Sequence, residues 1–230
     1  MTTPLPWSPS SLETFVTCGR QYHGKYVEKR YPPEEPSEQQ TYGLETHKHF
    51  ELRGENPDYV LPYHLLIHEP FMKKLDTLPG IVHVENKVAL TKKLLAVGWS
   101  HQPKEEIWYR GVIDYLKVDP ASKRAWIVDY KTGKPHAKFR QLISYALYVF
   151  IRYSMVDLID VRFYWTRDGT TTRKVWGRAE IDALWGELIG DLKQYREAFK
   201  TDTWQERPSG LCGWCPDTEC KHWRPRRERF

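Results

Sequence analysis

The apolar positions of this 230-residue chain repeat with two different periods, and the period changes along the sequence. Up to about residue 78 the spacing is three to four residues, which is typical of amphipathic helices. From about residue 80 to 133 apolar and polar residues alternate, as in half-buried strands. The predicted helices cover 8–27, 41–53, 64–78, 138–153 and 179–199, and the predicted strands cover 80–90, 93–99, 107–118, 124–133 and the two arms of a hairpin at 157–177.

Turn and cap residues support several of these boundaries. Ser8 can cap the first helix, and Pro9 suits its first position. The sequence DPASK supplies a turn between the strands at 107–118 and 124–133, and Asp168-Gly169 supplies the turn of the last hairpin. The Pro- and Glu-rich stretch 31–40 has no period and predicts an exposed loop.

The order of elements predicts the fold class. Helices come first, a meander of strands follows, and the chain ends in a strand–helix–strand–helix pattern. This order predicts an α/β (α+β) fold with a mixed central sheet flanked by helices on both sides. We expect one integrated domain in three parts: an N-terminal helix with the first cysteine (1–30), a core (31–200), and a cysteine-bearing segment with a basic tail (201–230).

Composition narrows the class of protein. No run of about 18 apolar residues exists, so no membrane span is expected. The N-terminal residues lack the pattern of a signal peptide, which predicts a cytoplasmic location. The net charge of +5 is compatible with a polyanionic partner without requiring one. The last ten residues, KHWRPRRERF, form either a solvated tail or a patch that contacts phosphates.

The stretch IVDYKTGK places an acid and a lysine on one face of a strand. Asp129 and Lys131 point to the same side because side chains alternate along a strand. A simple ion pair at a sheet edge would explain these two alone. However, Asp114 lies 15 residues earlier on the preceding strand, and a hairpin of that length can bring the two carboxylates together. Two close carboxylates favour a cation, and oxygen ligands favour Mg²⁺ or Mn²⁺.

A helical motif offers a further ligand. Gly43, His47 and Glu51 are spaced four residues apart in GLETHKHFE, on one face of the predicted helix. His47 could complete the metal site, or it could be a surface or capping histidine. Glu51 could support His47. Glu85 is expected either to approach the same site or to be a solvated strand residue.

The helix that follows the acid–lysine strand carries a row of polar and aromatic residues. Gln141, Tyr145 and Tyr148 flank its apolar stripe. Such a row can grip a phosphate or stack a base beside a metal ion. Tyr148 is equally explained by packing and is left out of the predicted site.

Four cysteines lie near the two ends of the chain, at positions 18, 212, 215 and 220. Two disulfides are disfavoured because nothing in the sequence suggests secretion. A Cys-x-x-Cys loop with a third cysteine nearby is typical of a metal-binding segment. Cys18, Cys212, Cys215 and Cys220 could hold Zn²⁺ or an iron–sulfur cluster, and their spacing does not decide between them.

The motifs taken in order resemble a known family. The pattern G-x-x-x-H-x-x-x-E, then G-x-x-D, then D-Y-K-T-G, then Q-x-x-x-Y is similar to the RecB-like nucleases of the PD-(D/E)XK superfamily, over residues 8–223. The resemblance implies a restriction-endonuclease-like fold and a metal-dependent DNA nuclease. It implies a site made of His47, Asp114, Asp129 and Lys131, with the backbone carbonyl of Tyr130 as a further metal ligand and with Glu51, Gln141 and Tyr145 in support.

The cysteines resemble those of the iron–sulfur branch of these nucleases, which includes a CRISPR-associated exonuclease and the AddB subunit. That branch has one cysteine before the nuclease core and three after it, which implies a [4Fe-4S] cluster here. It also implies an exonuclease acting on single-stranded DNA ends in recombination, repair or DNA processing. The protein would be phage-encoded, and then located in the host cytoplasm, or CRISPR-associated, and its protein partners are not indicated.

Two other functions fit the same sequence. One is a catalytically inactive nuclease fold that binds DNA without cutting it. The other is a zinc-binding interaction protein whose acidic residues are only structural. The presence of every catalytic motif of the family counts against the first alternative.

Overall fold

The computed structural model describes residues 3–32, 35–135 and 138–224, and the chain forms two compact units. One unit comprises Pro36–Glu187, and the other combines Met1–Glu35 with Leu188–Phe230. Most of the basic tail, residues 225–230, lies outside the described residues. No helix in the described ranges is long and apolar enough to cross a membrane.

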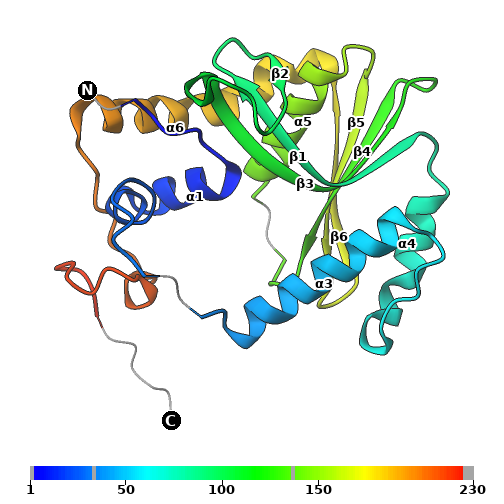
Figure 1. The fold of residues 1–230 in the computed structure, drawn as a ribbon, viewed down its shortest axis with the longest axis horizontal. Coiled ribbons are helices and arrows are strands. Elements are labelled where there is room, and N and C mark those ends of the chain that lie inside the picture. The colour runs from blue at the N-terminus through cyan, green and yellow to red at the C-terminus, as the bar shows by residue number, and fades with distance from the viewer. Residues whose placement is uncertain (1–2, 33–34, 136–137, 225–230) are drawn as a thin grey trace. The chain divides into compact units, whose positions relative to one another are not determined.

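A six-stranded mixed sheet forms the centre of the 36–187 unit (Figure 1). The strands lie in the order β2-β1-β3-β4-β5-β6. Strands β4 and β5 are parallel, and every other neighbouring pair is antiparallel. This arrangement confirms the predicted mixed sheet. The strand bounds are β1 Ile81–Thr91, β2 Ala96–Val97, β3 Ile107–Asp119, β4 Arg124–Lys131, β5 Leu158–Trp165 and β6 Thr170–Gly177.

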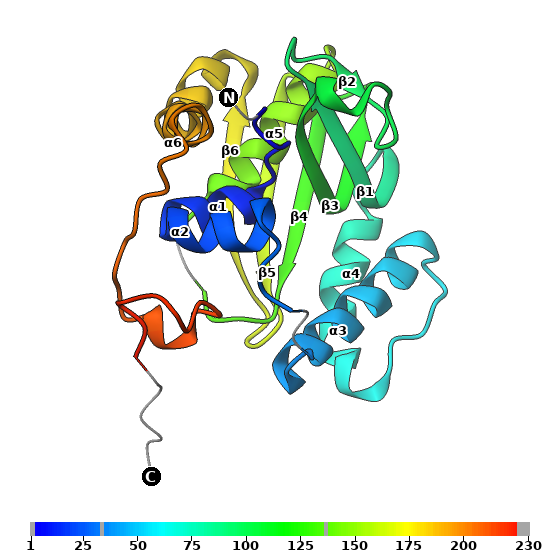
Figure 2. The same ribbon diagram turned by 60° about the vertical axis from the view of Figure 1, so that its left-hand side comes forward.

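Helices cover both faces of this sheet. Val128 and Tyr130 of β4 pack in one buried cluster with Phe50 of α3 (Glu38–Glu55) and with α4 (Glu69–Asp76). Asp129, which lies between them on β4, contacts Gln141 of α5 (Arg140–Arg152) instead. Because side chains alternate along a strand, α5 covers the opposite face from α3 and α4, as Figure 2 shows. The prediction of helices on both sides is therefore confirmed.

Local capping sets where α3 begins. The Ser37 side chain accepts a hydrogen bond from the Gln40 backbone, and the Gln40 side chain accepts one from the Ser37 backbone. This capping box starts the helix three residues before the predicted start at 41, so the end of the predicted loop 31–40 is helical. The predicted helix 64–78 is a 3-10 helix, η2 (Tyr63–His68), which continues into α4.

In the terminal unit the predicted helix 8–27 is broken at Cys18. Helix α1 covers Pro9–Thr17, with Ser8 as its cap, and α2 covers Gly19–Tyr22 before a π-helical turn, His23–Val27. Cys18 is extended, and the Gly19 N–H donates to the carbonyl of Gln205 (2.9 Å) instead of continuing the helix. The other helices are α6 (Ile181–Thr201), which begins in the sheet unit, and the short 3-10 turns Lys104–Glu106, Arg178–Glu180 and Cys212–Trp214.

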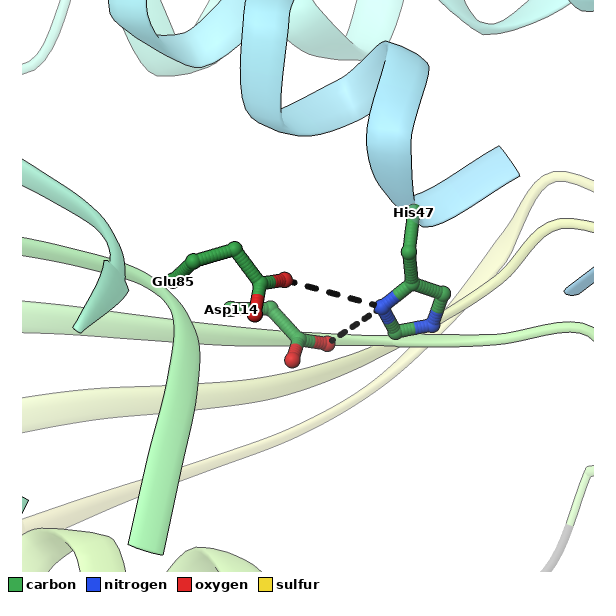
Figure 3. Close-up of side chains that lie close together, drawn as sticks. All are labelled: His47, Glu85 and Asp114. Atoms are coloured by element: carbon green, nitrogen blue, oxygen red, sulfur yellow. Dashed lines mark ion pairs between the residues drawn. The ribbon is translucent and has the colours of Figure 1, made fainter. Parts of the chain in front are cut away.

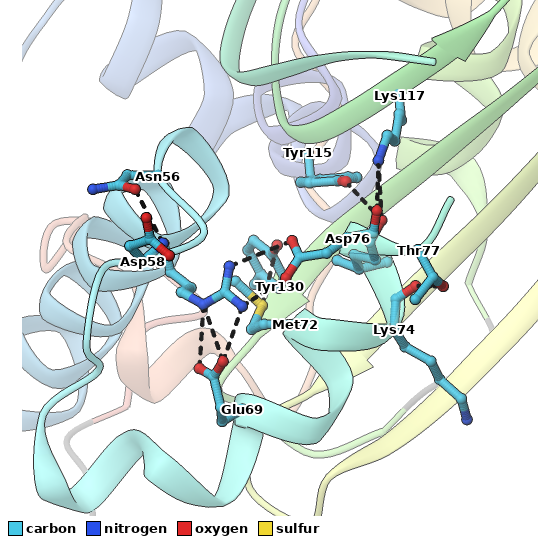
Figure 4. A network of polar contacts seen from close by, with 12 residues as sticks. Asn56, Asp58, Glu69, Met72, Lys74, Asp76, Thr77, Tyr115, Lys117 and Tyr130 are labelled. Atoms are coloured by element: carbon cyan, nitrogen blue, oxygen red, sulfur yellow. Dashed lines mark hydrogen bonds and ion pairs between the residues drawn. The ribbon is translucent and has the colours of Figure 1, made fainter. Parts of the chain in front are cut away.

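A buried arginine fixes α3 against α4. The Arg53 side chain on α3 is 2% exposed and forms ion pairs with Glu69 (2.9 Å) and Asp76 (2.7 Å), which lie at opposite ends of α4. The Lys117 ammonium on β3 donates to the carbonyls of Leu75 (3.2 Å) and Asp76 (3.3 Å) at the end of the same helix (Figure 4). These contacts hold α3, α4 and β3 in a fixed arrangement.

Replacing Arg53 with alanine should lower the free energy of unfolding of the sheet unit by about 3 kcal/mol, because it removes a buried cation that two carboxylates share. Lys48→Ala, on the same helix, removes an ion pair at the surface and should lower the free energy of unfolding much less. Urea unfolding of the full chain measures both. Equal, small losses in the two variants would contradict the structural role of Arg53.

Candidate active site

The two carboxylates predicted to hold a cation lie where β3 and β4 stop pairing. The last paired residues are Tyr115 and Val128, and the next positions in the same register are Asp114 and Asp129. There the backbone N–H of Tyr130 donates to Oδ2 of Asp114 (2.8 Å). This hydrogen bond to a side chain replaces the backbone hydrogen bond that continued pairing of β3 and β4 would form. Both acids are buried, with Asp129 only 1% exposed.

Helix α3 brings His47 to this point. Its Nε2 lies 3.0 Å from the carbonyl oxygen of Tyr130. Its Nδ1 lies 3.6 Å from Oδ2 of Asp114 and 3.9 Å from Oε1 of Glu85 (Figure 3). One ligand atom from each of His47, Glu85 and Asp114 lies within 4.8 Å of the other two, and no other such group of metal-binding side chains occurs among the described residues.

The sequence did not decide whether Glu85 approaches the candidate site or is a solvated strand residue. In the structure its carboxylate lies near His47 and Asp114. The pairs Val84–Tyr115 and Asn86–Ile113 put Glu85 directly opposite Asp114 on the neighbouring strand. The Glu85 backbone has φ +44°, in the left-handed region that non-glycine residues rarely adopt. Such backbone strain is often found at functional sites, and here it accompanies a carboxylate aimed at His47.

A second network holds Asp129 and Lys131. The Gln141 amide donates to Oδ1 of Asp129 (2.6 Å), and its carbonyl oxygen accepts from the Lys131 ammonium (2.9 Å). Lys131 also forms an ion pair with Oδ2 of Asp129 (2.5 Å). Asp129 and Lys131 therefore share a face, as predicted, and one glutamine on α5 links them.

Tyr145 and Glu51, two predicted supporting residues, each contact another polar side chain. Tyr145, predicted to flank the apolar stripe of its helix, is 3% exposed, and its hydroxyl accepts from Gln141 (2.9 Å). A Cβ on Gly111 would lie 3.1 Å from the Tyr145 ring and 2.6 Å from the Tyr109 hydroxyl, so the glycine of G-x-x-D lets both rings pack close to β3. Glu51 forms an ion pair with Lys48 (2.8 Å), and its support of His47 stays a prediction.

Burial and like charges raise the proton affinity of the site. Burial, together with the nearby Asp129 charge, raises the pKa of Asp114 to about 8. Burial also raises the pKa of Asp129, although Lys131 opposes the shift. Burial alone would lower the pKa of His47, but Glu85 and the two aspartates outweigh it and raise that pKa. At neutral pH Asp114 therefore holds a proton, and a metal cation that displaced this proton would stabilise the ionised carboxylates.

The four cysteines line one pocket of the terminal unit, and all four are free thiols. No three of their sulfur atoms lie within 4.8 Å of one another. Asp217, which lies between Cys215 and Cys220 in the sequence, forms an ion pair with Arg20 (2.7 Å), two residues after Cys18. This ion pair, in which the Asp217 carboxylate is buried, joins the two segments that carry the cysteines.

Comparison with known proteins identifies the family. Residues 6–220 match the family model of the PD-(D/E)XK nuclease superfamily. The chain belongs to this superfamily. The match covers both acidic strands, the D-Y-K-T-G motif and all four cysteines, but it does not assign the chain to the iron–sulfur branch.

Comparison with individual proteins gives no assignment finer than the superfamily. No curated protein matches the chain. One similar solved structure, described as "Crystal structure of SSO0001", is 14% identical, with a TM-score of 0.41, and the match covers 96% of this chain and 89% of that one. A likeness at this TM-score carries no argument about function.

Membership of the PD-(D/E)XK superfamily sets the general chemistry. It implies a metal-dependent nuclease with a nucleic-acid substrate. The six-stranded mixed sheet flanked by helices agrees with the restriction-endonuclease-like fold that the motifs predicted. The group of His47, Glu85 and Asp114 is a candidate site for the metal of this superfamily.

In EDTA, Asp114→Asn should be more stable to unfolding than the wild type. This difference in stability should grow as the pH rises from about 4 to about 8. The unfolded chain loses the Asp114 proton near pH 4, whereas the folded chain keeps it up to about pH 8, so the wild-type aspartate costs more stability as pH rises through this window. Asparagine carries no charge and can still accept from the Tyr130 N–H.

Thermal unfolding of both proteins between pH 4 and 9 measures this difference. Asp160→Asn is the matched control with the opposite sign. Burial alone would raise the pKa of Asp160, but Arg162 and Arg173 lower it, so that variant should lose stability above pH 4. A constant difference between wild type and Asp114→Asn at all pH values would contradict the assignment.

Proposed function

We propose that this chain is a DNA exonuclease that requires Mg²⁺ or Mn²⁺ and degrades DNA from single-stranded ends. The observation that carries this proposal is the convergence of His47, Glu85 and Asp114, from one helix and two strands, beside the Asp129–Lys131 pair. Membership of the PD-(D/E)XK superfamily supports a metal-dependent nuclease, and the motifs that resemble RecB-like nucleases support the exonuclease assignment.

The donor atoms fit a hard divalent cation. Carboxylate oxygens, a backbone carbonyl and one imidazole suit Mg²⁺ and Mn²⁺. Oδ2 of Asp129 is buried and pairs with the Lys131 ammonium, and a bound metal ion would share this oxygen with the lysine. We propose His47, Asp114, Asp129 and the carbonyl oxygen of Tyr130 as metal ligands. We add Glu85 because its carboxylate lies within 4.8 Å of ligand atoms of His47 and Asp114. The bound cation would polarise the scissile phosphate and lower the pKa of a water molecule.

The protein's own groups position that chemistry. Lys131, held by Gln141 and Asp129, places an ammonium group beside the carboxylates, where it orients the attacking water or offsets the negative charge that develops on the phosphate. Gln141 fixes Lys131 and Asp129 relative to each other from α5. His47 is held by the Tyr130 carbonyl and kept in place by α3.

The choice of DNA and of single-stranded ends rests on the resemblance to the iron–sulfur branch of RecB-like nucleases. The net charge of +5 suits a polyanionic substrate but does not distinguish DNA from RNA. The same resemblance supports a role in recombination, repair or DNA processing, in a phage or CRISPR setting. The proposed location is the cytoplasm, which is the host cytoplasm if the protein is phage-encoded. The inactive DNA-binding module and the zinc protein become outcomes of the experiments below.

The four cysteines line one pocket of the terminal unit, where they can act as one set of metal ligands. Both Zn²⁺ and an iron–sulfur cluster take four cysteine ligands. The resemblance to the iron–sulfur branch of RecB-like nucleases favours the cluster. We therefore propose that Cys18, Cys212, Cys215 and Cys220 hold the cluster, with structural Zn²⁺ as the alternative.

Asp129→Asn and Lys131→Ala should each lower Mn²⁺-dependent cleavage of end-labelled single-stranded DNA by at least about 100-fold, because each removes a group that acts on the reacting phosphate or its metal. Glu85→Gln should lower it as well if Glu85 binds the metal. Initial rates with labelled single- and double-stranded substrates, with and without Mn²⁺, measure the effect and the strand preference.

Glu106→Gln is the matched control, since Glu106 is an exposed acid that pairs with His101 away from these residues. It should cleave at the wild-type rate. Undiminished cleavage by purified Asp129→Asn or Lys131→Ala would remove the mechanism. Wild-type protein that binds DNA but does not cut it with Mn²⁺ or Mg²⁺ would favour the inactive binding module.

Protein purified without oxygen should be brown and contain about four irons per chain. Cys212→Ser should lose the colour and most of the iron, whereas Ser209→Ala, whose side chain caps the same loop, should keep both. Metal analysis and the visible spectrum measure this. A colourless protein with one zinc per chain would reject the cluster and support the zinc alternative.

A further inference from the structure

An exposed aromatic and aliphatic patch lies on the sheet unit beside the candidate active site. It consists of Tyr42 on α3 and of Tyr63, His64, Leu66 and Ile67 on η2, and we call it the α3–η2 patch. Tyr63 is 92% exposed, Ile67 79%, Leu66 42% and Tyr42 41%. The Tyr42 and His64 rings, 6.4 Å apart, join the two elements. Exposed apolar groups gathered in this way commonly mark a binding surface.

The patch stands on a rigid base. Within η2, Leu65 is fully buried in the core, and His68 is 3% exposed with its Nδ1 2.8 Å from the Tyr164 hydroxyl. The 3-10 helix continues directly into α4, which Arg53 holds against α3. Because Leu65 and His68 are fixed in the core, Tyr63, Leu66 and Ile67 point outward. The patch is therefore held in place before any ligand binds.

The patch is continuous with the catalytic residues through α3. Tyr42 precedes His47 by five residues, a rise of about 7.5 Å along the helix. Between them, a Cβ on Gly43 would lie 3.3 Å from Oγ1 of Thr132, the residue after Lys131. The glycine thus lets the D-Y-K-T-G loop approach α3 next to the patch. Tyr42 and His47 therefore lie within two turns of one helix.

We propose that the α3–η2 patch is a stacking platform for unpaired nucleobases of the DNA strand that enters the active site. This inference rests on the proposed nuclease function and adds the source of its preference for single strands. Bases in a duplex already stack on both sides, whereas unpaired bases have free faces that aromatic side chains can cover. Two tyrosines and a histidine supply planar rings, and Leu66 and Ile67 extend the apolar surface.

The charges around the patch are compatible with this occupant. Glu45 is the nearby acid, and its carboxylate lies 3.7 Å from His64 and 3.8 Å from His49. Stacking brings the uncharged faces of the bases against the rings and leaves the phosphates to turn away toward solvent or toward Lys131. Binding through base faces therefore does not require a basic surface at η2.

The test compares two probes in EDTA, where cleavage is prevented. Fluorescence anisotropy measures the binding of oligothymidine and of an abasic oligomer of the same length. Tyr63→Ala and Tyr42→Ala should weaken oligothymidine binding by roughly 5- to 100-fold. Both should leave the binding of the abasic oligomer unchanged. Tyr63→Phe keeps the ring and should bind like wild type, and Ile81→Ala, an exposed residue at the start of β1, is the distant control.

Two outcomes would overturn the inference. One is equal binding of oligothymidine by wild type and both alanine variants, or an equal loss on the abasic oligomer. The other is a wild-type dimer that Tyr63→Ala converts to a monomer in light scattering, which would make the patch an interface between copies. Failure of the proposed function is distinguishable, because ring-dependent binding without Mn²⁺-dependent cleavage would leave the platform and reject the nuclease.

Discussion

Two buried carboxylates at the point where β3 and β4 part are the constraint around which the site is built. Asp114 and Asp129 occupy neighbouring positions in the register where pairing has ended, and both lie almost entirely out of water. Burying charge in this way is costly unless it is compensated. The surrounding groups each supply a donor or a positive charge: the Tyr130 N–H, the Gln141 amide and the Lys131 ammonium.

These groups do not fully offset the cost of burying two ionised carboxylates, which favours a metal cation at the site. The pKa of Asp114 stays near 8 despite its hydrogen bond from Tyr130, and burial raises the pKa of Asp129 although Lys131 pairs with it. Glu85 adds a third carboxylate from a strained backbone position. A fold selected for stability alone would not gather these groups, so three neighbouring carboxylates, two of them with ionisation opposed by burial, are the strongest structural argument for a divalent cation.

The sequence predicted the parts of the site that depend on local geometry. Strand alternation placed Asp129 and Lys131 on one face, and a short hairpin brought Asp114 beside them. Glu85 could not be assigned because its position depends on the β1–β3 register and on an unusual φ. The break at Cys18 was missed for a similar reason, since Gly19 donates to Gln205, 186 residues away in the sequence. In each case a contact distant in sequence overrode a local pattern.

The proposed catalytic groups alone would not explain a preference for one form of nucleic acid. Carboxylates, a lysine and a cation would act on the phosphate, which is the same in single strands and in duplexes. Any discrimination must come from surfaces that contact the bases or sense the shape of the strand. The rigid support that Arg53 gives to α3 and α4 matters here, because it holds His47 and the exposed rings of Tyr42 and Tyr63 on one framework. A base stacked on those rings would then fix the register of the adjoining phosphate at the metal site, so that recognition of the strand and positioning of the bond to be cut become one event.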